Sequence, residues 1–146
     1  MNGLTSADLE FAQRFTAGEL PPRDFDHRAH LRLAYVHLAG HGPDEAVMTF
    51  REALLGFLRH HQIDPNKFHE TLTRAWLQAV WLFMQRAGDT ADSEDFMQRS
   101  SVLHDPKVML THYSKDVLFG DEARRRFVVP DLDPISLAIG PSVRRA

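Results

Sequence analysis

Apolar residues recur every three or four positions along most of the chain, which is the spacing of one face of an α-helix. Between residues 43 and 60 this face consists of Ala46, Phe50, Ala53, Leu54 and Phe57. A second apolar band runs from Phe68 to Phe83 with the same period. No run of alternating β-branched residues is long enough to demand a strand. The pattern therefore predicts an all-α protein.

Capping residues and prolines predict where the helices begin and end. Pro43, Pro65 and Pro106 each follow a Gly or Asp and suit the first position of a helix, and Asp26 suits an N-cap. We expect helices over residues 6–17, 27–39, 43–60 and 65–86, followed by shorter ones over 93–103, from 106, and over 121–128. The connections are short, which predicts a single-domain antiparallel bundle of about six helices with the 65–86 helix at its centre.

Prolines also divide the chain into a bundle and a tail. Pro130, Pro134 and Pro141 forbid a continuous helix over residues 130–146, whereas residues 1–129 carry the helical pattern. The tail nevertheless holds apolar residues that need cover, namely Leu132, Ile135, Leu137 and Ile139. We expect an irregular tail that packs on the bundle or on a partner subunit, and the second case predicts a homodimer.

Composition narrows the class of protein. A chain of 146 residues with 43% hydrophobic content fits one globular domain. Its 17 Lys and Arg residues against 20 Asp and Glu residues give a net charge of −3, which argues against nucleic-acid binding. The N-terminus lacks the pattern of a secretory signal, and no apolar stretch approaches the length of a membrane span. We expect a soluble, cytoplasmic protein with no membrane contact.

Histidine is the residue type that points to chemistry. The chain has nine histidines and no cysteine, so His, Asp and Glu are the remaining candidates for metal ligands. His27 and His30 form an H-x-x-H step at the start of one expected helix, and His69 lies near the start of another. If helix direction alternates, both helices begin at the same end of the bundle. His30 and His69 would then lie at nearly the same level.

Three imidazoles at one end of a bundle are the ligand set of an open metal site. Residues three apart share a helix face, so His27 and His30 point the same way, and His69 faces them from the second helix. The sequence therefore predicts a divalent metal, zinc or iron, bound by His27, His30 and His69, with a position left for water or substrate.

Other side chains would complete a pocket around these histidines. Thr73 and Trp76 follow His69 by four and seven positions, so we expect them to line the pocket and contact a cofactor or a small-molecule ligand. If the site is catalytic, Glu70 or Tyr113 would transfer protons. The sequence leaves open whether the protein is an enzyme.

The alternative interpretation is a non-catalytic helical interaction or dimerisation module, in which the histidines are structural. An H-x-x-H pair is a weak signal, because many half-buried histidines simply bond to backbone carbonyls. His37 and His41 lie ten and fourteen residues beyond His27, or roughly 15 and 21 Å by helical rise, and cannot join the same site.

The chain resembles a family of small bacterial proteins that have no established activity. The resemblance rests on F-x-H-R-x-H-L-R-L-A (residues 25–34), on Y-H-E-T-x-T (68–73, with Phe68 in place of Tyr) and on Y-Y-S followed by A-R-x-x-F-V-x-P-D (112–114 and 123–131). It covers nearly the whole chain. A tyrosine usually stands at the position of His112 in that family, whereas Tyr113 and Ser114 match. The resemblance implies no particular reaction.

Overall fold

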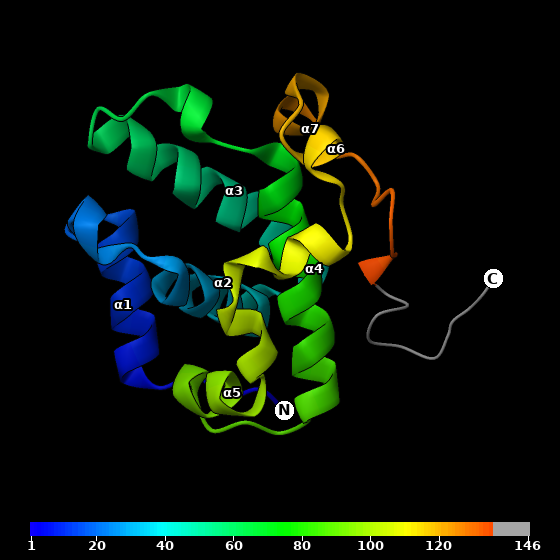
Figure 1. Cartoon of the computed structure of the whole chain (residues 1–146). Helices are drawn as coiled ribbons and strands as arrows, with labels where there is room; N and C mark the ends of the chain where they lie inside the picture. The colour runs from blue at the N-terminus through cyan, green and yellow to red at the C-terminus, as the bar shows by residue number, and fades with distance from the viewer. Residues whose placement is uncertain (136–146) are drawn as a thin grey trace.

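The computed structural model describes residues 1–135, and it confirms the all-α fold (Figure 1). The α-helices are α1 (Ser6–Thr16), α2 (His27–His41), α3 (Pro43–His60), α4 (Glu70–Ala87), α5 (Ser93–Arg99), α6 (Lys115–Leu118) and α7 (Asp121–Arg125). Short 3-10 helices lie between them at η1 (Pro22–Asp24), η2 (Pro65–Lys67), η3 (Ser101–His104) and η4 (Pro106–Thr111). The described residues contain no β-strand, and their single β-bridge joins Asn2 to Thr90.

Helix α2 occupies the centre of the molecule. It packs against α1, α3, α4 and α5, and none of its residues from Ala29 to Ala39 is exposed. The sequence pattern had placed the later helix at the centre. Helix α4 instead keeps Arg74, Gln78 and Gln85 on a solvent face. The two helices carry similar apolar bands, and both contact α5. They differ in that α1 packs onto α2, whereas α7 packs onto α4.

Local capping explains most helix starts. The Asp26 side chain accepts a hydrogen bond from the Ala29 amide at 2.9 Å, which confirms the predicted N-cap of α2. Helix α1 begins at Ser6, as predicted, and is capped by the Thr5 side chain. The expected 65–86 helix is divided, because Pro65–Lys67 forms a separate turn capped by Asp64 and α4 begins only at Glu70.

Three phenylalanines join α1, the loop before α2, and α3. Phe15 stacks on Phe57 with 4.6 Å between ring centroids, and Phe25 lies 4.7 Å from Phe15 and 5.3 Å from Phe57. Such aromatic clusters bury large apolar areas. The cluster fixes the loop that leads into His27 against the end of α3, and it forms one wall of the pocket described below.

The described part of the tail packs on the bundle. The Leu132 amide donates to the His112 carbonyl at 2.9 Å, and Ile135 is fully buried. Leu132 itself is 54% exposed, while Leu137 and Ile139 lie outside the described residues. Among residues 1–135, no helix combines the length and apolar character needed to cross a membrane.

Candidate functional site

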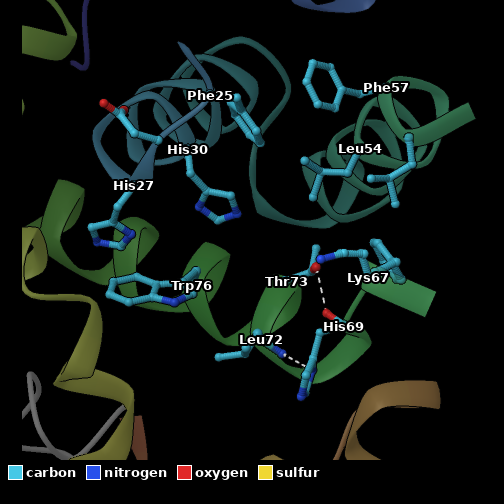
Figure 2. A pocket seen from close by; sticks show the side chains of 13 residues that line it. Phe25, His27, His30, Leu54, Phe57, Lys67, His69, Leu72, Thr73 and Trp76 are labelled. Carbon is cyan, nitrogen blue, oxygen red and sulfur yellow. Dashed lines mark hydrogen bonds between the residues drawn. The ribbon is translucent and has the colours of Figure 1, made fainter. Parts of the chain in front are cut away.

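A pocket of about 370 Å³ opens between the start of α2, the C-terminal half of α3 and the start of α4 (Figure 2). Its volume lies in the range of sites that hold small molecules. The lining is mainly apolar and aromatic, with contributions from Phe25, Leu54, Phe57, Leu58, Phe68, Leu72 and Trp76. Asp26 and Lys67, one of each charge, are its exposed charged lining residues.

His30 is the polar group of α2 that lies between the three helices around this pocket. Its ring lies between α2, α3 and α4 (Figure 2), with the edge of the Phe50 ring 5.3 Å away and the Phe25 ring 5.8 Å away, centroid to centroid. Nδ1 of His30 is buried and has no hydrogen-bond partner among residues 1–135. Burial, and to a smaller extent the neighbouring His27, lowers the pKa of His30 to about 4. The imidazole is therefore neutral at physiological pH.

His27 lies beside His30 on the same face of α2, as the three-residue spacing predicts. The two rings are nearly parallel, with 6.5 Å between their centroids. Nε2 of His27 donates to the Leu103 carbonyl at 2.9 Å, and the His27 ring meets the Trp76 indole edge-on at 4.8 Å. The hydrogen bond ties the start of α2 to η3, so His27 has a structural role in addition to lining the pocket.

His69 is the N-cap of α4 and is not part of the helix. Its backbone is extended, and its Nδ1 accepts a hydrogen bond from the Leu72 amide at 3.0 Å. On the other edge of the ring, Nε2 donates to the Leu118 carbonyl at 2.6 Å. These two bonds fix the neutral Nε2–H tautomer and use both nitrogens. Burial is the largest cause of the lowered pKa of His69, and Arg124 lowers it further.

The rings of His27, His30 and His69 therefore do not converge on one point, contrary to our expectation. All three residues line the pocket, but Figure 2 shows the His69 ring pointing away from the rings of His27 and His30. Within residues 1–135, no group of three or more His, Asp or Glu side chains is placed to hold a metal ion. The prediction assumed that His69 lies one turn inside a helix, whereas α4 begins after His69 and the ring caps it.

Thr73 and Trp76 lie where their spacing from His69 predicts, on the pocket wall formed by α4. The Thr73 hydroxyl donates to the His69 carbonyl at 2.7 Å, so its lone pairs remain as acceptors. Trp76 is 6% exposed and packs its ring against His27. Their contact with a bound molecule remains a prediction.

Glu70 and Tyr113 are not among the residues that line this pocket. The Glu70 carboxylate pairs with Arg51 at 2.8 Å and faces a separate surface hollow between η2 and α7. Tyr113 is fully buried, and its hydroxyl donates to the Val128 carbonyl at 2.6 Å. Burial, with a smaller contribution from Asp131, raises the pKa of Tyr113 to about 12. The two residues that we expected to transfer protons therefore do not share the pocket with His27 and His30.

Sequence reasoning missed the apolar half of the site. The sequence places Leu54 and Phe57 on the apolar face of a helix and gives Phe25 no role. All three nevertheless line the pocket, on the wall opposite α4. Leu54 and Phe57 belong to the regular apolar face of α3, so nothing in the pattern distinguishes a pocket wall from ordinary packing. Phe25, one residue before the N-cap of α2, is where hydrophobic staples occur, and this was the one available signal.

No family model matches this chain, and neither a curated protein nor a solved structure matches it.

Proposed function

We propose that the protein binds a small, largely apolar or aromatic molecule in the pocket between α2, α3 and α4, with His30 as its hydrogen-bonding partner. The observation that carries the proposal is the neutral imidazole of His30, whose buried Nδ1 has no partner in the described part of the chain, beside an apolar cavity of about 370 Å³. Buried polar groups without partners cost free energy, and they are concentrated at functional sites. A ligand that satisfies the ring would recover part of this cost.

The lining favours an uncharged ligand. The pocket is walled mainly by phenylalanine, leucine and tryptophan side chains, which cannot compensate for the desolvation of a charge. A neutral imidazole has one donor and one acceptor nitrogen, so a ligand hydroxyl or carbonyl can pair with it. Thr73 adds a second acceptor on the opposite wall. Phenols and small aromatic alcohols combine these properties.

The test is a fragment titration followed by NMR of the histidine rings. We expect phenol and benzyl alcohol to shift the imidazole signals of His30, and benzene to shift them less. His30→Phe keeps an aromatic ring of similar size but removes both nitrogens. It should bind phenol more weakly by about tenfold, the loss expected from one hydrogen bond of roughly 1.5 kcal/mol. Benzene affinity should remain within about twofold.

A second variant and a metal control complete the experiment. Leu54→Trp fills the cavity from the α3 side and should abolish binding of every fragment while the protein stays folded. If phenol shifts no His30 signal, or if Leu54→Trp binds as well as the wild type, the proposal is wrong. Zinc and iron are titrated in parallel. Stoichiometric binding lost in His30→Phe would instead support the metal site that the sequence predicted, which requires the His69 ring to turn towards His27 and His30.

A further inference from the structure

A second pair of histidines lies on α2, one turn apart and outside the pocket. His37 and His41 share a helix face, and their ring centroids are 5.9 Å apart. Both border a groove between α1 and α2 that is otherwise lined mainly by small and apolar side chains. The pair begins ten residues after His27, or roughly 15 Å along the helix, so it is independent of the proposed pocket.

Hydrogen bonds from α3 hold both rings by the same edge. Nδ1 of His41 lies 2.8 Å from Oε2 of Glu45, and Nδ1 of His37 lies 2.8 Å from the hydroxyl of Thr49. Because Nδ1 and Nε2 are on opposite edges of an imidazole, both Nε2 atoms are turned away from α3. Both residues line the groove between α1 and α2, and we infer that their Nε2 atoms are directed towards it.

Glu45 determines which nitrogen of neutral His41 carries the proton. A carboxylate only accepts, so Nδ1 of His41 must be the donor to Glu45. The Thr49 hydroxyl lies 2.8 Å from Nδ1 of His37 and 3.4 Å from the Ala46 carbonyl, so it can donate to Nδ1 or accept from it, and both tautomers of His37 satisfy this contact. In the neutral form of His41, Nε2 carries a lone pair and no proton, and a metal ion bound at Nε2 of His37 would select the matching tautomer, in which Nδ1 donates to Thr49. Two such nitrogens on adjacent turns are a chelating pair for a metal ion.

We propose that His37 and His41 form a two-histidine site for a divalent late transition-metal ion, oriented by Thr49 and Glu45. A metal–nitrogen bond of about 2.1 Å places each ring centroid about 3.2 Å from the ion, so a separation of 5.9 Å spans an angle of about 130° at the metal. Closing this separation by about 1 Å gives a tetrahedral or square-planar angle. The His27–His30 pair, at 6.5 Å, already exceeds the span of a linear arrangement.

The surroundings favour a cation. Hydrogen bonding of a ligating histidine to a carboxylate, as in His41–Glu45, raises the basicity of the other nitrogen and fixes the ring. His41 is also the last residue of α2, where the carbonyl ends of the helix favour positive charge. Imidazole ligands with open positions select copper, nickel and zinc, with copper bound most tightly. No third protein ligand joins the pair within residues 1–135, so solvent or an external ligand completes the coordination.

The test is a titration of the full, untagged chain with Cu²⁺, followed by calorimetry and by electron paramagnetic resonance to count bound nitrogens. We expect one site with two imidazole nitrogens. His41 is exposed, so His41→Gln should fold normally and bind Cu²⁺ at least tenfold more weakly. Glu45→Gln should keep both nitrogens but weaken binding by about tenfold, the effect of losing an outer hydrogen-bonding partner.

His30→Gln is the matched control, because it removes a histidine of the same helix and should leave Cu²⁺ affinity within about twofold. The inference is overturned if His41→Gln binds Cu²⁺ as tightly as the wild type, or if His30→Gln is the variant that loses the ion. Failure of phenol to bind in the pocket would not affect this result, since the two sites share no residue.

Discussion

Because the pKa of His30 is lowered, we expect the protein to lose stability in mildly acidic solution, at a pH well above the range in which carboxylates titrate. The pKa of His30 is about 4 in the folded protein against 6.5 for an unperturbed histidine. Below about pH 6.5, His30 becomes protonated in the unfolded chain but stays neutral in the folded protein. The unfolded state then binds more protons, so the free energy of unfolding falls as the pH falls. With these two pKa values, His30 alone lowers the free energy of unfolding by about 2 kcal/mol when the pH falls from about 7 to about 5.

The assay is urea denaturation at about pH 7 and about pH 5 in the presence of a chelator, with His30→Phe and Leu54→Ala as comparison proteins. His30→Phe should lose about 2 kcal/mol less than the wild type over this interval. Leu54→Ala weakens the same pocket without removing a titrating group, so it should keep the full wild-type loss. His37, whose pKa burial also lowers to about 4, contributes equally to all three proteins.

Carboxylates do not obscure this comparison. Asp8 is buried and accepts hydrogen bonds from Ser93 and Arg32, and its pKa is lowered from 3.8, so its contribution is lost only below the interval used. An equal loss of stability in the wild type and in His30→Phe would refute the reasoning, because it would mean that His30 takes up its proton in the folded state as readily as in the unfolded chain.

Three further predictions concern stability and are checked by urea or thermal denaturation. His69→Ala should lower the free energy of unfolding by about 2–3 kcal/mol, because it removes the cap of α4 and leaves the Leu118 carbonyl without its donor. His69→Asn can still cap the helix and should cost less, so equal losses in the two variants would contradict the capping role. Gly18→Ala should lower the free energy of unfolding by about 1 kcal/mol or more, since φ of Gly18 is +78° and the added carbon would lie 2.5 Å from the His60 ring. An unchanged melting temperature would contradict this backbone strain. Truncation after Val129 uncovers the site of Ile135 and should cost about 1.5–3 kcal/mol, whereas no change would show that this contact is weak.

The sequence predicted the helices well because their signals are local. Apolar spacing, the N-cap at Asp26 and the proline at the first position of α3 act within one or two turns, so the starts of α2 and α3 were predicted correctly. The start of α4 was not, because Pro65 suits a long helix and a short 3-10 turn equally. What decides between them is the imidazole of His69, which acts as the cap although histidine is not a preferred capping residue.

The sequence predicted that the residues of the pocket lie near one another, but it did not predict the directions of the histidine rings. His27, His30, Thr73 and Trp76 were expected at one end of the bundle and do line one pocket. Which way each ring points depends on partners distant in the chain, such as the carbonyl that receives the Nε2 proton of His69 from 49 residues away. Such tertiary contacts have no periodicity, and for this reason the His69 ring was wrongly expected to face His30.

The bonds of His27 and His69 to main-chain carbonyls have a consequence for how this site would evolve. Every residue type offers the same carbonyl oxygen, so a substitution at position 103 or 118 that preserves the backbone leaves the acceptor in place. Pairwise co-variation between aligned sequences detects contacts that constrain two side chains at once. These two histidines would therefore vary independently of the segments that orient them, and a contact map inferred from co-variation would omit the bonds that orient both rings.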